Sequence, residues 1–362
     1  MRKLLTLVLA VAVIVSLVAV GCAKPVPAPA PAPTPAPAPA PSPHEPFQMY
    51  IYGPPAHVSS YVLAVAMSEV ISKYSEWLKC TAVEGTSPPN NAKRIFVDPD
   101  LRKRSLMHCP NPNHWELVDV PGLTKDIDYD FSQMRYVLYL GLAANGMISV
   151  NPEVRTIADF KGKRINVSDT PPPDQFSTLI FSQVKAAGLD PDKDIKKQTL
   201  NFGQSHIALK DGLVDSVLTG FVASDTRANQ WLAASYLEEV ISTKHTYYID
   251  FDAEALKKTM EETGLPYPPY VIPANTLKWQ TEPWTLAVKY MAWVCYPEFP
   301  DDVVAEILRI ISEHYSELAE FNPAFADVCR QNLGLMGPSL QYYHPVAMKF
   351  FKDNGIQVGI LD

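Results

Sequence analysis

Residues 156–176 read Thr156-Ile-Ala-Asp-Phe-Lys-Gly-Lys-Arg-Ile-Asn-Val-Ser-Asp-Thr-Pro-Pro-Pro-Asp-Gln-Phe176. They predict a short helical turn, a tight turn at Gly162 and a strand from Arg164 to Val167. A polar loop, Ser168 to Asp174, and then a helix follow. In open α/β sheets, ligands bind outside the carboxyl ends of the strands, where helix starts leave backbone N–H groups free. The segment therefore predicts an α/β fold with a binding loop.

A second unit of the same kind follows. Ser205-His-Ile-Ala-Leu-Lys-Asp-Gly212 predicts a helix that stops at a glycine, and Ser216 to Leu218 predicts a buried strand. We expect this strand to end in a second loop, Thr219-Gly220-Phe221. The two loops are expected to form one wall of a small-molecule cleft, while the rest of the chain supplies the other wall, the hinge and the anchor.

Composition narrows the class of protein. The chain has 362 residues, of which 47% are hydrophobic and 19% charged, so it can bury the cores of two lobes. A net charge of −8 and the lack of a basic stripe argue against a nucleic-acid surface. No G-x-S-x-G, H-E-x-x-H, G-x-G-x-x-G or P-loop motif occurs, so we expect no enzymatic activity and no cofactor.

The N-terminus predicts an export signal. Arg2 and Lys3 precede an apolar run over residues 4–20, which is typical of a secretory signal peptide. The small residues directly before Cys22 resemble a lipobox, the bacterial signal for lipid attachment to that cysteine. An uncleaved membrane helix is the alternative, because the run is about long enough to span a bilayer. We expect residues 1–22 to be a lipoprotein signal peptide and the mature protein to be extracytoplasmic, anchored to the cell-envelope membrane.

Residues 23–46 are dominated by Pro-Ala repeats, which favour extended polyproline geometry and cannot form a core. We interpret them as a spacer. With Cys22 lipidated, four cysteines remain, an even number that suits an oxidising compartment, although four buried thiols fit the spacing equally well. Their pairing stays open because sequence gives no geometry. These four are Cys80, Cys109, Cys295 and Cys329.

The alternation of predicted strands and helices in the remaining chain predicts two α/β lobes joined by a hinge. We expect lobe 1 to comprise residues 47–149 and 273–362, and lobe 2 to comprise residues 150–272. Strands are expected at Gln48–Tyr52, Leu78–Val83, Ser105–Cys109, Met134–Leu140, Met147–Val150 and Leu286–Val294. Helices are expected at Ser59–Trp77, Gln175–Ala187, Ala223–Tyr236, Ala253–Thr263, Pro300–Phe321 and Pro345–Asn354.

Candidate ligand contacts are polar or small residues at predicted strand ends. Serine and asparagine at such places equally often cap helices, so each residue has two readings, and only the set points to a cleft. From lobe 1 the set comprises Gly53, His57, Ser59, Ser60, Thr86, Asn90 and Asn91. From lobe 2 it comprises Ser168, Asp169, Thr170, Gln175, Thr219, Gly220 and Phe221.

The order of several motifs along the chain resembles the TAXI family, the extracytoplasmic solute-binding subunits of TRAP transporters. The resemblance covers about Met49 to Ile356. It implies a bilobed fold of the periplasmic-binding-protein type (type II), which closes on a small carboxylate or amino acid and delivers it to an integral membrane permease. The motifs are Ile157-Ala-Asp-Phe-Lys-Gly-Lys-Arg-Ile165, Ala187-Gly-Leu-Asp190, Ala208-Leu-Lys-Asp-Gly-Leu-Val-Asp215, Pro300-Asp-Asp-Val-Val304 and Tyr343-His-Pro-Val-Ala347.

Three loops depart from that family. Its glycine-rich loops are replaced by Tyr52-Gly-Pro-Pro-Ala-His57, Gly85-Thr-Ser-Pro-Pro89 and Ser168-Asp-Thr-Pro-Pro-Pro173. Proline removes a backbone N–H and fixes φ, so these loops have fewer donors for an anion. Asp169 and Asp174 add negative charge where a carboxylate would bind. The transport role survives these changes, while the ligand of the family is put in question.

Other readings remain. An ABC-type receptor shares the fold, and a sensor lipoprotein would present the ligand to a signalling receptor. An envelope hydrolase could use His57 with Ser60, but no orienting third group is identifiable. His108, Cys109 and His114 lie close in sequence, but their spacing fits no common metal motif, so no metal is expected.

Overall fold

The computed structural model describes residues 44–56, 58–85, 88–109, 133–167 and 174–361. Cys22, the signal segment and the Pro-Ala tract to Pro43 lie outside these ranges, and so do His57, Thr86, Ser168, Asp169 and Thr170. His44–Asp362 form one compact unit. Within the described ranges, no helix is both long enough and apolar enough to cross a membrane.

One mixed sheet organises the described chain, and its strands follow the order β2-β1-β3-β11-β4-β7-β5-β6. At one end, β1 (Phe47–Gly53), β2 (Leu78–Glu84) and β3 (Ser105–Cys109) are parallel. The helix α2 (Ser59–Tyr74) packs against β2 and against α10 (Asp301–His314). These alternating strands and helices confirm the predicted α/β class at this end of the sheet.

The other end of the sheet repeats the pattern. Here β5 (Arg164–Asn166) pairs in parallel with β6 (Lys196–Gln198) and with β7 (Ser216–Asp225). The helices α6 (Gln175–Ala186) and α9 (Ala253–Thr263) pack against each other. Met147, Phe160, Ile165, Leu218 and Ala287 share one hydrophobic cluster of this half.

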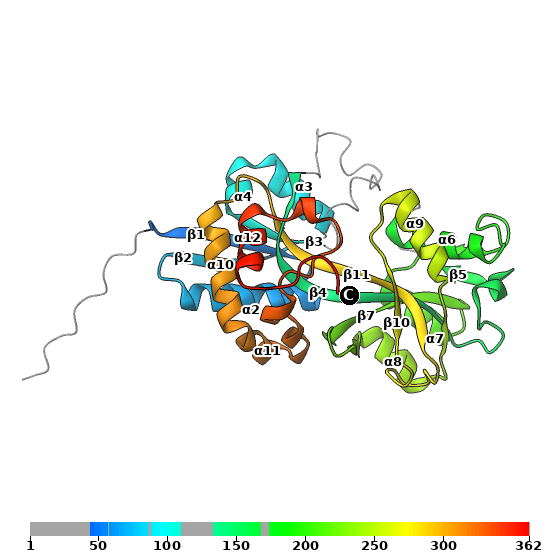
Figure 1. The fold of residues 1–362 in the computed structure, drawn as a ribbon. Helices are drawn as coiled ribbons and strands as arrows, with labels where there is room; N and C mark the ends of the chain where they lie inside the picture. Colours follow the sequence, from blue (N-terminus) through cyan, green and yellow to red (C-terminus); the bar gives the residue numbers. More distant parts are fainter. Residues whose placement is uncertain (1–43, 57, 86–87, 110–132, 168–173, 362) are drawn as a thin grey trace, which may run out of the picture. The chain divides into compact units, whose positions relative to one another are not determined.

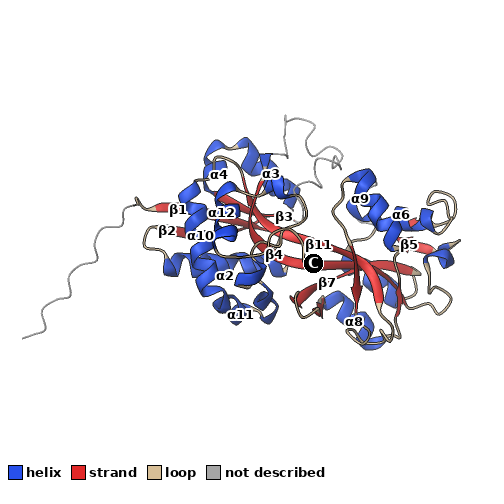
Figure 2. Cartoon of the chain, viewed as in Figure 1, coloured by secondary structure: helices blue, strands red, loops and turns tan. Residues whose placement is uncertain are grey.

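Two long strands join the halves. β4 (Arg135–Ser149) and β11 (Trp284–Cys295) are antiparallel, and their register runs from Cys295↔Arg135 to Ala287↔Asn145. β11 pairs with β3 at one end, and β4 pairs with β7 at the other. Figures 1 and 2 show β4 and β11 as continuous strands between the two groups of helices. Within the described ranges, β4 and β11 therefore connect the two halves through one shared sheet.

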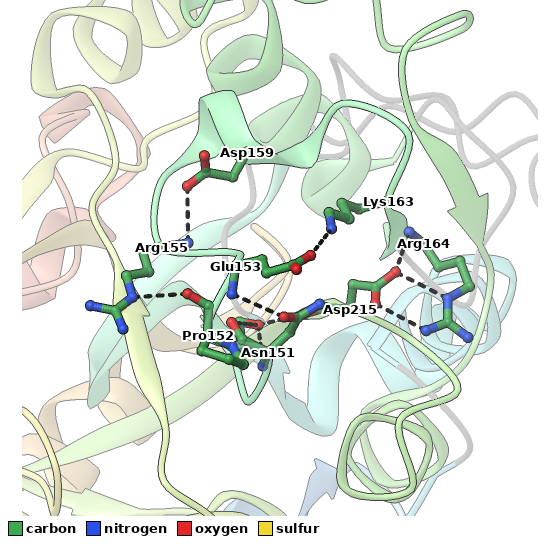
Figure 3. Close-up of polar contacts among 9 residues, drawn as sticks. Asn151, Pro152, Glu153, Arg155, Asp159, Lys163, Arg164 and Asp215 are labelled. Carbon is green, nitrogen blue, oxygen red and sulfur yellow. Dashed lines mark hydrogen bonds and ion pairs between the residues drawn. The ribbon is translucent and has the colours of Figure 1, made fainter.

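The segment around β5 is fixed by ion pairs and a capping box. The Asp159 carboxylate accepts hydrogen bonds from the backbone N–H groups of Arg155 (3.1 Å) and Thr156 (2.9 Å), which closes the short helix Ile157–Phe160. The Arg164 guanidinium donates two bonds to the Asp215 carboxylate, at 3.0 and 2.9 Å (Figure 3). Because Asp215 directly precedes β7, this bidentate pair holds β5 in register with β7.

Most predicted elements are confirmed, and the prediction of Ala253–Thr263 matches α9 at both ends. One expected element is wrong and one is divided. The helix expected over Ala223–Tyr236 is the end of β7, a turn with Asn229 at φ 54°, and the strand β8 (Gln230–Ala233); only Ser235–Thr243 is helical, as α8. The helix expected over Pro300–Phe321 reaches Phe321 but is divided: α10 ends at His314, a 3-10 helix covers Tyr315–Glu317, and α11 covers Leu318–Phe321.

Two segments that were expected to be loops are part of a strand and of a helix. The strand that was expected to end at Leu218 continues through Thr219-Gly220-Phe221 to Asp225, so these three residues are part of β7. The segment expected as a loop at residues 85–91 contains the start of α3 (Pro88–Val97). No disulfide joins the four cysteines of the described part.

Candidate functional site

The carboxyl ends of β1 and β2 lie at the same level, because Gly53 is directly opposite Glu84. Asn91, in the first turns of α3, donates a hydrogen bond from Nδ2 to the Gly53 carbonyl at 2.8 Å and is 3% exposed. A Cβ at Gly85 would lie 2.1 Å from Asn91 Oδ1, so only glycine fits there. The structure thus brings the predicted residues Gly53 and Asn91 together, and Asn91 is a buried positioning residue.

The turn between β1 and α2 offers few donors. Pro54 and Pro55 have no N–H, the Ala56 N–H donates to the Glu84 carboxylate at 2.8 Å, and the Val58 N–H donates to the Pro55 carbonyl at 2.9 Å. Every N–H described in this turn is therefore engaged, and a carboxylate stands beside it. An anion would find an unfavourable site at this turn.

The remaining predicted residues of lobe 1 lie on the helices that follow. Ser59 is exposed and Ser60 buried at the start of α2, which has no side-chain cap and no acidic residue in its first turn. Asn90 is exposed on α3. These positions share the sheet edge with Gly53.

In lobe 2 the predicted residues separate onto two faces of the sheet. Gln175 begins α6 and accepts a hydrogen bond from the Tyr267 hydroxyl. Thr219 is buried, with its Oγ1 2.9 Å from His206 Nε2, and Phe221 is buried with its ring stacked on Trp284. Because side chains alternate along a strand, Gly220 faces the side opposite to Thr219 and Phe221.

The face of Gly220 carries a set of residues that the sequence analysis did not single out. Asn145 on β4 is opposite Gly220, and Ala143 on the same strand is opposite Lys289 of β11. A Cβ at Gly220 would lie 3.1 Å from Asn145 Nδ2 and 3.2 Å from the Tyr236 hydroxyl. Directly opposite residues in a ladder share a face, so Lys289, Asn145 and Gly220 lie on one face. The sequence signal was a single lysine within the apolar strand Trp284–Cys295.

A groove of about 270 Å³ lies elsewhere, between α7 (Phe202–Lys210) and α8. Lys210 and Glu239, which form an ion pair, line this groove together with Tyr236. The aromatic rings of Phe176, Phe202 and Tyr236 follow one another, with centroids 5.4 and 5.5 Å apart. This aromatic row connects the groove with α6.

The described ranges hold no cluster of three or more residues that could bind a metal ion.

Two buried histidines are held neutral. Burial lowers the pKa of His206 to about 4, against a smaller opposing effect of the Phe202 carbonyl. Burial, followed by the charge of Lys289, lowers the pKa of His108 to about 3. Neither ring nitrogen of His108 has a hydrogen-bond partner within the described part. Both rings therefore resist protonation in the folded chain.

We expect this to make the fold acid-sensitive. The folded pKa values lie below the unfolded value of about 6.5, so the unfolded chain binds more protons and stability falls as the pH drops from about 6.5 towards 4. Between pH 7 and 5, each histidine should lower the free energy of unfolding by about 2 kcal/mol. Urea denaturation of the wild type and His206→Gln at both pH values measures this. The variant should lose about half of the pH-dependent change, and an unchanged pH dependence would contradict the assignment.

The chain belongs to the NMT1-like family, whose family model matches residues 127–355. No protein with a curated description matches the chain.

Several solved structures are similar to this chain at low sequence identity. The periplasmic aliphatic sulphonate binding protein SsuA from Escherichia coli is 14% identical, with a TM-score of 0.46 over 88% of this chain and 94% of that one. MatC from Rhodopseudomonas palustris, solved with bound malate, is 10% identical, with a TM-score of 0.47 over 86% and 97%. A TRAP periplasmic solute binding protein from Sulfitobacter, solved with α-D-taluronate, is 10% identical, with a TM-score of 0.40 over 88% of each chain.

Proposed function

We propose that this protein is the extracytoplasmic solute-binding subunit of a TRAP-type transporter. The observation that supports it most is the pair of strand-end edges, at β1/β2 and at β5, joined by the long strands β4 and β11. In α/β sheets such edges are where ligands bind. Two halves joined through a shared sheet can close on a solute by a hinge movement.

The solute would be a small organic molecule, a carboxylate or an amino acid. It favours the closed arrangement because it contacts both halves only there, and its differential affinity sets how far the equilibrium shifts. The closed form would then dock on integral membrane permease subunits. No bond of the solute is changed in this cycle, so the protein acts as a receptor and not as an enzyme.

The anchoring is part of the proposal. A signal peptide ending at Cys22 would export the chain and attach lipid to that cysteine, and the Pro-Ala tract would act as a spacer between membrane and receptor. The lipid would hold the receptor near its permease and raise their effective concentration. Detergent partitioning of the wild type and Cys22→Ala, expressed in a bacterium, would reveal the anchor.

We expect calorimetric titration to detect a solute. The chain from residue 47 onward is titrated with single organic acids and amino acids, and at least one should bind with 1:1 stoichiometry. Asn91→Leu should weaken that binding about tenfold, because it removes the bond that holds the Gly53 turn. Asn354→Leu, at an exposed position after α12 (Pro345–Asp353), is the matched control and should bind like the wild type.

The titration can also contradict the proposal. Failure of every solute to bind would contradict the receptor function. Equal weakening in Asn91→Leu and Asn354→Leu would mean that the strand-end edge plays no part in binding. A gene neighbour that encodes an ATPase in place of a TRAP permease would assign the receptor to an ABC system.

A further inference from the structure

Among the residues that the structure describes, Lys289 has no counter-charge. Its side chain is half-buried in the middle of β11, and it makes no hydrogen bond or ion pair with any residue of the described ranges. The ammonium lies 5.2 Å from the ring centroid of Phe176. Burying an ammonium that is neither paired nor fully hydrated is costly, so such a group is rarely retained for stability alone.

Register places Lys289 between the two strand-end edges. His108, at the carboxyl end of β3, is opposite Trp293, four residues after Lys289 on β11. In the other direction, Ala287 is opposite Asn145, which is opposite Gly220 on β7. Lys289 therefore stands on the part of β11 that crosses from one half to the other, where a solute held by both edges would touch the sheet.

The strand neighbours of Lys289 on that face are mostly small. Lys289 is directly opposite Ala143 of β4, which is itself opposite Val222 of β7. Gly141 and Gly220 lie one pair further along, in opposite directions, and carry no side chain. Asn145 lies diagonally opposite Lys289, on the order of 7–8 Å away in a ladder of this kind. Asn145 is 3% exposed, and its Oδ1 has no hydrogen-bond partner in the described part of the chain.

The turns at the sheet edges do not provide the groups that would recognise an anion. Pro54, Pro55 and the bond from Ala56 to Glu84 leave the β1 turn without a described donor. The start of α6 is capped by its own Asp174, whose Oδ1 accepts from the Phe176 N–H at 2.8 Å. Recognition of an anion by backbone N–H groups at these two places would compete with a carboxylate already present.

We propose that Lys289 binds the acidic group of the solute from the floor of the sheet, and that Asn145 Oδ1 accepts a hydrogen bond from a donor next to that group. This inference rests on the receptor function proposed above and names the class of its ligand: a small organic anion with an amino or hydroxyl group beside the acidic group. The Phe176, Phe202 and Tyr236 rings would contact the rest of the molecule. Consistent with an uncompensated site, burial lowers the pKa of the Lys289 ammonium to about 8.

The test uses the chain from residue 47 and pairs of probes that differ only in charge: L-lactate, L-malate, L-glutamate and L-phenylalanine, each beside the corresponding amide. The wild type should bind at least one carboxylate about 100-fold more tightly than its amide. Lys289→Met should bind that carboxylate about 100-fold more weakly and lose the preference over the amide. Asn145→Leu should weaken it about tenfold, and Lys289→Arg should retain part of the preference.

Two further readouts separate binding from folding. Without ligand, Lys289→Met should melt at the wild-type temperature or a few degrees above it, because the change removes an unpaired half-buried charge. The ammonium of Lys289, observed by NMR after ¹³C-methylation, should titrate at a higher pH when the carboxylate is bound. Lys258→Gln, on the exposed side of α9, is the matched control and should change none of these quantities.

The outcomes distinguish this inference from the receptor function. If Lys289→Met binds a carboxylate with wild-type affinity, or if the wild type binds the amides as tightly, the role of Lys289 is wrong while the receptor function stands. If Lys289→Met melts well below the wild type, Lys289 is a structural residue. If no probe binds to the wild type, this ligand class is contradicted, and binding of a neutral solute in the wider titration would leave the receptor function intact.

Discussion

Replacing Asp327 by alanine should lower the free energy of unfolding by about 3–5 kcal/mol. Asp327 is 3% exposed in the C-terminal segment, and its carboxylate accepts hydrogen bonds from the Tyr139 hydroxyl (2.6 Å) and from the Thr226 N–H and hydroxyl (both 2.7 Å). Asn332 Nδ2 donates a further bond at 3.0 Å. Removing the carboxylate would leave these buried donors unsatisfied, and each costs about 1–3 kcal/mol.

The same network ties three distant parts of the chain together. Tyr139 lies on β4, Thr226 directly follows β7, and Asp327 comes from the segment between α10 and α12. Burial raises the pKa of the Asp327 carboxyl, although the hydrogen bonds from Tyr139 and Thr226 oppose this effect. The C-terminal segment is therefore fixed to the strands that join the halves.

Urea denaturation measures this prediction, with Asp353→Ala as the matched control. Asp353 pairs with Lys349 on the exposed side of α12, and such surface pairs contribute about 0–1 kcal/mol. Asp327→Asn should fall between the two, because the amide keeps one acceptor but presents NH₂ to donors. A loss below about 1 kcal/mol for Asp327→Ala would contradict the network.

Trp284→Ala should destabilise the fold by about 3–5 kcal/mol. Trp284 is 1% exposed and begins β11, its ring stacks on Phe221 with centroids 5.6 Å apart, and its Nε1–H donates to the Ile249 carbonyl at 3.0 Å. A Cβ at Gly146 would lie 2.3 Å from the Trp284 ring. The indole thus fills a site that exists only because β4 has glycine at that position.

A double-mutant cycle tests this close approach. Gly146→Ala alone should cost about 1–3 kcal/mol by overpacking. In the Trp284→Ala background the same change should cost much less, because the added methyl group enters the space left by the indole. Additive losses in the cycle would show that Gly146 and Trp284 do not compete for one site.

The sequence predicted those elements whose own residues show a local hydrophobic pattern. Hydrophobic periodicity located α2, α6 and α9, and a short apolar run located β1. The prediction was wrong at Gly220, because this glycine was interpreted as a strand end. In the structure it lies within β7, where a Cβ would fit tightly between Asn145 and Tyr236. Glycine in a strand marks close approach as often as an end.

Other errors have equally local causes. Pro88 and Pro89 suggested a loop, yet proline fits the first turn of a helix, and α3 begins there. Residues 223–236 contain helix-forming side chains, but Asp225 Oδ1 accepts from the Ala228 N–H and turns the chain into a hairpin.

The residues of the candidate site also differ in whether the sequence could predict them. Gly53 and Asn91 could be found from sequence because they directly flank a strand and a helix start. Lys289 and Asn145 could not, because their proximity depends on the register of β11, β4 and β7, which lie far apart in the chain. The expected boundaries of the lobes stay predictions.

Small-angle X-ray scattering of the chain from residue 47, with and without a saturating solute found by titration, tests the central claim most directly. We predict that the bound chain has a smaller radius of gyration than the dialysed chain, because the solute holds both halves around the crossing strands. A bound chain whose scattering curve is the same as that of the dialysed chain would contradict closure on the solute.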